Sequence, residues 1–354
     1  MHGTARPAGG PARTWVVRAV VLLLVAGLSV VAFRLIGQVD WDAVGRGLGH
    51  LSWWQIPVLF GLLVMRQVFN SLPLDFYIAG MSPYRATLND QVGVLIGTMF
   101  PPPSDLALRT AMFSSWGVPI ADGVAGALLH KLTFYIVRYS APAAGLLILL
   151  VRGDRLGVRL LDLASIALAI GIAVILLLVM HSTALARTLG RRSGRLFRRV
   201  RRRVDPDAWA LSWGDFHDRV AARFHRGFVR SLLALVAMLA VSCLMAVLCL
   251  RFVGVGSGSD GVPTSVIVAA YLVAFPLTLF PFNGIGLLDA AVVGAIVAAG
   301  GHHLEAPALA AMIAWRVFTL GGPMLMGVVS LLIWHRTWGA EAGLWQLIRR
   351  RASH

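Results

Sequence analysis

Charged side chains are scarce in this chain of 354 residues, where Asp, Glu, Lys and Arg together make up 14% and hydrophobic residues make up 58%. Soluble domains carry about one-quarter charged residues, so this composition excludes an ordinary soluble protein. Four apolar stretches approach or exceed the roughly 18 to 20 residues that cross a hydrocarbon layer. They are residues 16–36, 161–180, 228–250 and 308–334. The chain is therefore predicted to be a polytopic membrane protein.

Lysine and cysteine are almost absent, and nucleotide-binding motifs are missing. Lys131 is the single lysine, and Cys243 and Cys249 lie six residues apart in one apolar stretch, on different faces of a helix. No disulfide framework is therefore expected. His302 and His303 would point apart on a helix and lack a third ligand, so no metal site and no cofactor are predicted. Without a Walker motif, any transport energy would come from an ion gradient, a partner or the substrate's own gradient.

Arginine is abundant, and its distribution indicates the topology. Arginines without nearby acids precede the first apolar stretch, fill residues 187–203 and close the chain at residues 349–351. The positive-inside rule places all three regions in the cytoplasm. Both termini on one side require an even number of spans, and the apolar stretches fit about eight. We therefore predict an all-α protein with about eight transmembrane helices and cytoplasmic termini.

The same pattern divides the chain into five parts. We predict a cytoplasmic tail at 1–14, a first membrane half at 15–180, an Arg-rich cytoplasmic loop at 181–227, a second membrane half at 228–335 and a cytoplasmic tail at 336–354. Within the loop, apolar residues recur every three or four positions over 209–228. This spacing predicts an amphipathic helix, either on the inner membrane surface or packed on the protein itself.

Two apolar stretches are interrupted, and the first reads LIGTMFPPPSDLALR over residues 95–109. Three consecutive prolines follow its apolar run: Pro101, Pro102 and Pro103. They cannot continue a helix, because proline lacks the backbone N–H and its ring clashes with the preceding turn. A new helix can then start near Asp105, which places Asp105 and Arg109 four residues apart on one face.

The second interruption repeats this arrangement in the other half. Pro281, Gly284 and Gly286 interrupt an apolar run, and Asp289 follows where the helix resumes. Broken or re-entrant segments at corresponding places of two halves, as in an inverted repeat, point to the substrate site of transporters. Irregular backbone at membrane depth is tolerated only when it is buried or lines a cavity. The two breaks are therefore expected to meet near the centre of the protein, unless both are ordinary surface loops.

Several bases lie within apolar surroundings, where a base at mid-depth costs at least about 2.5 kcal/mol by insertion scales and is usually paired or functional. They are Arg109, Lys131, Arg138 and Arg316. Together they would suit the phosphate of a lipid head group. Asp105 and Asp289 are the candidate acidic partners or proton-coupling groups. No catalytic residue is predicted.

At these residues the chain resembles the flippase-like family of lysylphosphatidylglycerol synthase transmembrane regions, found in bacteria and archaea. In that family an apolar run ends in a Pro-containing turn followed by an acid and an arginine, as in PPPSDLALR. A later Pro, Gly-rich turn, acid and final-helix arginine are matched here by Pro281, Gly284, Gly286, Asp289 and Arg316. The family usually has Gly-Glu where this chain has Ser104 and Asp105, and Glu for Asp289, so the carboxylates here reach less far.

The resemblance implies a lipid transporter or flippase in the bacterial cytoplasmic (inner) membrane, acting on an anionic or polyprenyl-phosphate-linked lipid. No aminoacyl-transfer domain follows the membrane region in this chain, so lysyl transfer is not expected. The expected partners are membrane lipids, with anionic lipid at the Arg-rich loop and a cytoplasmic or envelope-pathway protein as a further candidate. Nucleic acid is not expected.

Two alternatives remain open from the sequence. One is a membrane-embedded glycosyltransferase that uses a lipid-linked sugar, for which Asp40 and Asp42 could supply a catalytic acid or metal site. Helical spacing of the apolar residues around them favours capping acids on an interfacial helix instead. The other alternative is a structural or assembly subunit of an envelope-lipid pathway, whose Arg-rich loop recruits a partner.

Overall fold

A computed structural model describes residues 49, 52–99, 104–153, 160–200, 205–256 and 261–338. Within these ranges the protein is helical and contains no strand. The elements are α3 (Gln55–Tyr77), α4 (Pro83–Met99), α5 (Ser104–Ser115), α6 (Ile120–Val151), α7 (Leu160–His181), α8 (Thr183–Val200), α9 (Pro206–Phe252), α10 (Thr264–Ala274), η1 (Phe275–Leu279), α11 (Pro281–Gly284), α12 (Leu287–Gly300), η2 (His302–Leu304), α13 (Glu305–Arg316), η3 (Val317–Gly321) and α14 (Gly322–Trp338). The predicted span at 16–36, the N-terminal tail, most of the C-terminal tail, Asp40, Asp42 and the three consecutive prolines lie outside the described residues.

Four helical segments are long and apolar enough to cross a membrane. They are Gln55–Tyr77, Ile120–Val151, Gly227–Phe252 and His302–Trp338. Shorter apolar helices cover Asp162–Leu178, Thr264–Leu279 and Leu287–Gly300. The predicted all-α membrane class is therefore confirmed, whereas the number of eight spans and the inverted repeat stay predictions.

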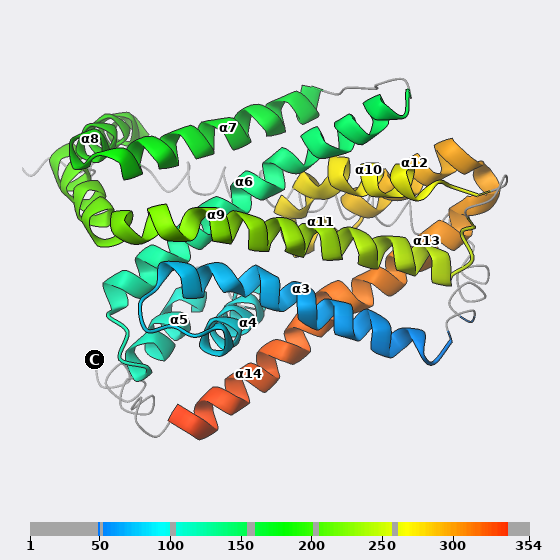
Figure 1. Cartoon of the computed structure of the whole chain (residues 1–354), viewed down its shortest axis with the longest axis horizontal. Coiled ribbons are helices and arrows are strands. Elements are labelled where there is room, and N and C mark those ends of the chain that lie inside the picture. Colours follow the sequence, from blue (N-terminus) through cyan, green and yellow to red (C-terminus); the bar gives the residue numbers. More distant parts are fainter. Residues whose placement is uncertain are drawn as a thin grey trace, which may run out of the picture.

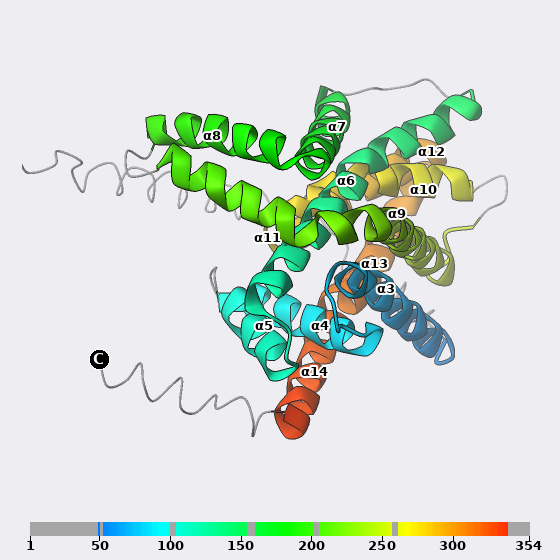
Figure 2. The same ribbon diagram turned by 60° about the vertical axis from the view of Figure 1, so that its left-hand side comes forward.

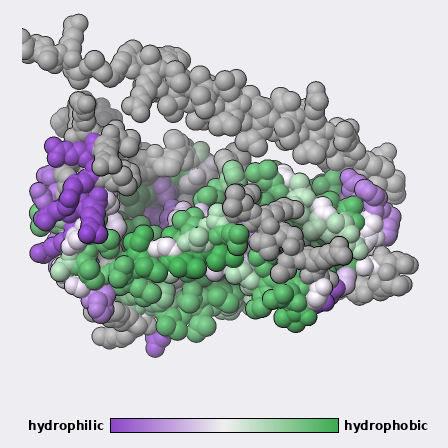
Figure 3. All heavy atoms as spheres, turned by 90° about the horizontal axis from the view of Figure 1, so that it is seen from above, coloured by the Kyte–Doolittle hydropathy of each residue, from purple (hydrophilic) through white to green (hydrophobic). Residues whose placement is uncertain are grey.

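The outer surface of these helices is apolar. Large side chains that would be costly to expose to water point outward along several helices, including Leu147 on α6, Ile170 on α7, Leu233 on α9 and Leu332 on α14, each 55% or more exposed. Figure 3 shows a broad hydrophobic surface, with hydrophilic side chains gathered toward the two ends of the molecule. Such a continuous apolar surface fits a lipid environment and not water. The protein is a multi-pass membrane protein.

Helices from both halves of the sequence pack together in one bundle (Figure 1). Helix α9 packs along α3 and α6, α10 packs against α6, and α14 packs against α4. The contact between α14 and α4 requires Gly327, because a Cβ there would lie 2.6 Å from the Cβ of Leu95 and 2.8 Å from the carbonyl oxygen of Gln91. The last helix is thereby held against the segment that precedes the first break.

The described part of the Arg-rich region, up to Val200, forms helix α8. Helix α8 lies beside the first part of α9 (Figure 2), and the two approach closely at Gly190, where a Cβ would lie 2.9 Å from the Trp209 carbonyl oxygen. Arginine is a good helix former, so the charge run does not oppose this structure. The predicted amphipathic helix at 209–228 is continuous with the following span as α9. At Gly227 helix α9 passes close to α3. A Cβ at this position would lie 2.9 Å from the carbonyl oxygen of Phe76, so a residue without a side chain allows the close approach.

Each break separates two helices that pack against each other as a short hairpin. Helices α4 and α5 pack against each other, and α10 packs against α12. Before the second break the α-helix ends at Ala274, and a 3₁₀ turn, η1, leads into the tip. Pro276 inside η1 and Pro281 after it explain why the α-helix cannot extend. Figure 1 places α4 and α5 toward the end of the molecule that carries α8, and the return of α12 into α13 at the opposite end.

Candidate functional site

The tip of the second hairpin is a left-handed turn. Asn283, Gly284 and Gly286 have φ angles of 55°, 67° and 82°. Glycine is needed at position 284 for two reasons. A Cβ there would overlap the carbonyl of Leu277, and the positive φ angle is unfavourable for a residue with a side chain. Asn283 is the single non-glycine residue with positive φ in the described ranges, and asparagine tolerates this conformation better than most residues.

Arg316 holds this tip in place. Its Nε donates to the Asp289 Oδ1 at 2.9 Å, its Nη1 to the Asn283 carbonyl at 3.0 Å and its Nη2 to the Gly284 carbonyl at 3.1 Å. Asp289 also accepts a hydrogen bond from the Gly286 N–H at 2.8 Å, which caps the first turn of α12. The guanidinium lies 4.9 Å from the Trp315 ring centroid. Both charged side chains are thus fully engaged in maintaining the break.

At the first break, Arg109 contacts an acid other than the one expected. Its Nη2 lies 3.0 Å from the Asp90 Oδ1, and the two side chains are 14% and 3% exposed. Asp105, four residues earlier on α5, makes no hydrogen bond or ion pair with a described residue and is half-buried near Gly97. The pairing differs from the helical-face prediction because α4 and α5 pack together, which brings Asp90 of α4 to Arg109. Spacing within one helix could not indicate this.

Asp90 belongs to a buried polar network that the sequence analysis missed. Its Oδ2 accepts from the Asn70 amide at 2.7 Å, and the Gln67 amide donates to Gln91 at 2.9 Å. His130, 7% exposed, lies within electrostatic range of Asp90. A signal was present in the sequence, because three consecutive polar residues, Asn89 to Gln91, directly precede the apolar run of residues 92–96. In the structure they are 0%, 2% and 0% exposed.

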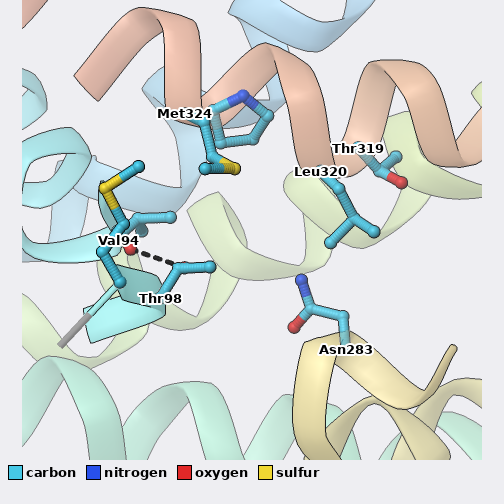
Figure 4. Close-up of a pocket in the computed structure, with 8 residues that line it drawn as sticks. Val94, Thr98, Asn283, Thr319, Leu320 and Met324 are labelled. Atoms are coloured by element: carbon cyan, nitrogen blue, oxygen red, sulfur yellow. Dashed lines mark hydrogen bonds between the residues drawn. The ribbon is translucent and has the colours of Figure 1, made fainter. Parts of the chain in front are cut away.

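A cavity of about 240 Å³ joins the two hairpins. One wall is the last turn of α4, another is the tip turn of the second hairpin, and the third is the junction of η3 and α14. Its lining residues are Val94, Thr98, Met99, Asn283, Thr319, Leu320, Pro323 and Met324. In Figure 4 the Asn283 amide points into the space between Thr98 and Leu320. The residues next to the two breaks therefore face one common cavity.

The cavity lining suits an amphiphilic molecule and not a free ion. Most of its surface is apolar, and its polar groups are the Thr98 and Thr319 hydroxyls and the Asn283 amide. No charged side chain lines it, and the described part of the chain has no cluster of His, Cys, Asp or Glu that could hold a metal ion. Both threonine hydroxyls already donate to backbone carbonyls, of Val94 and Trp315 respectively, so Asn283 is the polar group most available to a ligand.

The structure separates the four bases proposed for the phosphate. Arg109 and Arg316 are each paired with a carboxylate next to a break. Lys131 is exposed on α6, next to His130 of the polar network, and forms no ion pair with a described residue. Arg138 is 8% exposed within the bundle, stacked 4.7 Å from the Phe134 ring centroid. Arg66, absent from the sequence analysis although it too lies in an apolar stretch, donates to Ser242 at 2.8 Å and to Gln67 at 2.6 Å.

Comparison with known protein families finds one match over most of the chain. The model described as the lysylphosphatidylglycerol synthase TM region matches residues 15–327. This match includes both hairpins, the cavity and the buried polar network. No curated protein and no solved structure matches the chain significantly.

Proposed function

This chain belongs to the family of lysylphosphatidylglycerol synthase transmembrane regions, and we propose that it carries a phosphate-bearing lipid between membrane leaflets. The family ties the protein to lipid or envelope processes. The lipid is anionic or polyprenyl-phosphate-linked, and its path passes the cavity between the two hairpins. The bacterial cytoplasmic membrane is the proposed location, with α8 and both termini on the cytoplasmic side.

The observation that carries this proposal is the cavity at the meeting point of the two hairpins. Helix breaks at membrane depth require their backbone groups to be satisfied within the protein or by a cavity. At the second tip Arg316 satisfies two carbonyls, so the tip can line a cavity without exposing those carbonyls to lipid. A mostly apolar chamber with one available amide suits passage of an amphiphile.

The Arg-rich helix α8 supports the proposed orientation and one proposed partner. Arg187, Arg191, Arg192 and Arg195 lie along it, and Arg191 alone of these pairs with an acid in the part of the chain that the structure describes, at 2.9 Å from Asp207. Bases near an anionic leaflet gain about 1 kcal/mol each. Helix α8 is therefore proposed to contact anionic lipid, and it also offers a surface to a cytoplasmic or envelope-pathway protein.

The test is leaflet exchange in vesicles that contain only the purified protein and lipid. Vesicles would carry a fluorescent phosphatidylglycerol or a fluorescent neutral diacylglycerol, and a membrane-impermeant quencher would report the outer-leaflet fraction over time. We expect exchange of the phosphatidylglycerol to be faster than in protein-free vesicles. Exchange that never exceeds the protein-free rate, with phosphatidylglycerol or a polyprenyl phosphate, would contradict the proposal.

A matched pair of variants tests whether the cavity is the path. Thr98→Trp places an indole in the cavity, whereas Thr337→Trp places one on the exposed end of α14. Both threonines are exposed and make the same hydrogen bond to the carbonyl four residues earlier, at 2.7 Å. We expect Thr98→Trp to slow exchange about tenfold or more, equivalent to at least roughly 1.4 kcal/mol of barrier. Thr337→Trp should leave the rate unchanged, and equal slowing by both would exclude the cavity.

A further inference from the structure

Arg138 is a buried cation without a counterion. It lies in the middle of α6, is 8% exposed, and its Nε has no hydrogen-bond partner. Its guanidinium makes no hydrogen bond or ion pair with any described residue, and its contacts are the faces of Phe134 and Tyr135, at 4.7 and 5.7 Å. A guanidinium is always charged and carries five donors. Buried charges are ordinarily paired, so this side chain lacks the anion that its position requires.

A second guanidinium lies nearby on α3. Arg66 is within electrostatic range of Arg138, and both are within range of the Tyr271 hydroxyl. Arg66 donates to the neutral acceptors Ser242 and Gln67. Asp90 is within electrostatic range of Arg66, but no carboxylate within the described ranges forms an ion pair with it. Two like charges within electrostatic range of each other repel where water is excluded. An anion between them would convert that repulsion into two attractions.

Two other arginines of the interior have a carboxylate counterion. Arg109 is matched by Asp90, and Arg316 by Asp289. The excess positive charge is therefore located at the interface of α3 and α6. Two guanidinium groups with unused N–H donors can bind the oxygens of a phosphate through paired hydrogen bonds. The rings of Phe134 and Tyr135 stack on the Arg138 guanidinium and restrict its orientation.

We propose that Arg66 and Arg138 form a binding site for a phosphate group, filled by the phosphate of a lipid head group or by free phosphate. This inference deepens the proposed function. It rests on that function only in naming a lipid as the source of the phosphate. It replaces Arg109 and Arg316, which are each ion-paired with a carboxylate, by two arginines that form no ion pair with a described residue. The remaining polar groups at the site are the Ser242 and Tyr271 hydroxyls, of which Ser242 already accepts from Arg66.

Binding by the full-length chain in a neutral detergent tests the site directly. The probes are dioctanoyl phosphatidic acid, dioctanoylglycerol and inorganic phosphate, and the readouts are titration calorimetry and the Tm. We expect phosphatidic acid to bind and raise the Tm, and dioctanoylglycerol to do neither. Arg138→Gln should weaken this binding at least about tenfold, because it removes a charge-assisted contact. Arg336→Gln, at an exposed arginine of α14, is the matched control and should bind as the native chain does.

The stability of Arg138→Gln without ligand separates a binding role from a structural one. If Arg138 awaits an anion, removing its uncompensated charge should raise or preserve the Tm while abolishing the ligand-induced shift. A lower Tm with the ligand shift intact would overturn the proposal. Binding of phosphatidic acid alone would identify a head-group site, and binding of inorganic phosphate as well would identify a phosphate site that water reaches.

The two proposals can fail separately. Arg138-dependent binding without leaflet exchange would leave the site standing and remove the transport function. Leaflet exchange in vesicles with no Arg138-dependent binding would do the reverse. Absence of binding by all three probes, or equal binding by the native chain and Arg138→Gln, would overturn the site.

Discussion

At the scale of single residues, Arg109 reaches Asp90 only because Gly93 has no side chain. A Cβ at Gly93 would overlap the Arg109 guanidinium, which crosses α4 at this position. Gly97, one turn later on the same helix, has only the Asp105 Cβ nearby, at 3.8 Å. The two glycines therefore differ in function, although both lie in the apolar part of α4, four residues apart on the same helical face.

We expect Gly93→Ala to destabilise the protein and Gly97→Ala to leave it unchanged or slightly more stable. Displacing Arg109 leaves Asp90 buried and unpaired, at about 3 to 5 kcal/mol in well-buried cases. Replacing glycine by alanine in a helix returns about 1 kcal/mol, so the net loss is roughly 2 to 4 kcal/mol. Unfolding of the purified protein in detergent measures both variants. Similar stability of the two would contradict the proposed role of Gly93.

At the scale of elements, α14 connects the two hairpins. It follows Arg316 after the π-helical turn η3, contributes Pro323 and Met324 to the cavity, and then packs on α4 through Gly327. The wide turn of η3 occurs directly after the residue that holds the second tip. Helix α14 therefore sets the distance between the second tip and the last turn of α4.

Gly327→Leu should force α14 away from α4, whereas Gly321→Leu should not. A side chain at Gly327 meets backbone and a buried leucine, while a Cβ at Gly321 has nothing within 4 Å. Overpacking of this kind typically costs about 1 to 3 kcal/mol, and an exposed substitution stays within about 0.5 kcal/mol. The Tm in detergent and the leaflet-exchange rate would be measured together. We expect Gly327→Leu to lower the Tm and alter exchange, and a normal Tm and rate would show that the contact is dispensable.

At the scale of the whole molecule, charge is distributed along one axis. Helix α8, with its arginines, lies at one end of the bundle, and η2, which follows α12, lies at the other (Figure 1). The hydrophobic surface between these ends separates them (Figure 3). By the positive-inside rule we predict that α8 faces the cytoplasm and η2 the outside.

Single-cysteine labelling of intact cells tests this orientation. In a background without Cys243 and Cys249, both of which are buried, Thr188→Cys on α8 should resist a membrane-impermeant maleimide. His303→Cys at η2 should react, because both native side chains are exposed and the predicted topology places them on opposite sides of the membrane. Disruption of the membrane should make both sites react. Labelling of Thr188→Cys in intact cells would reverse the topology.

The amino-acid sequence by itself determined the class of protein, the positions of the breaks and the family. Apolar runs of membrane length follow from composition, and prolines or glycines end helices by local sterics whatever surrounds them. Residues 281–289 and Arg316 lie far apart in the chain and were related to one another only through the resemblance to the family. The class and the breaks depend on neighbours in the chain, so they can be read without a fold.

Only the tertiary structure decided which charges meet. Asp90 and Arg109 lie nineteen positions apart on two helices, and Arg66 and Arg138 lie on α3 and α6, so no helical period relates them. The same holds for the cavity, whose walls come from residues 94–99, Asn283 and residues 319–324. The Arg-rich region became a helix because α9 offered it a packing surface. Ion pairing and burial are contacts in space, and packing alone left Arg109 and Arg316 neutralised and Arg138 without a partner.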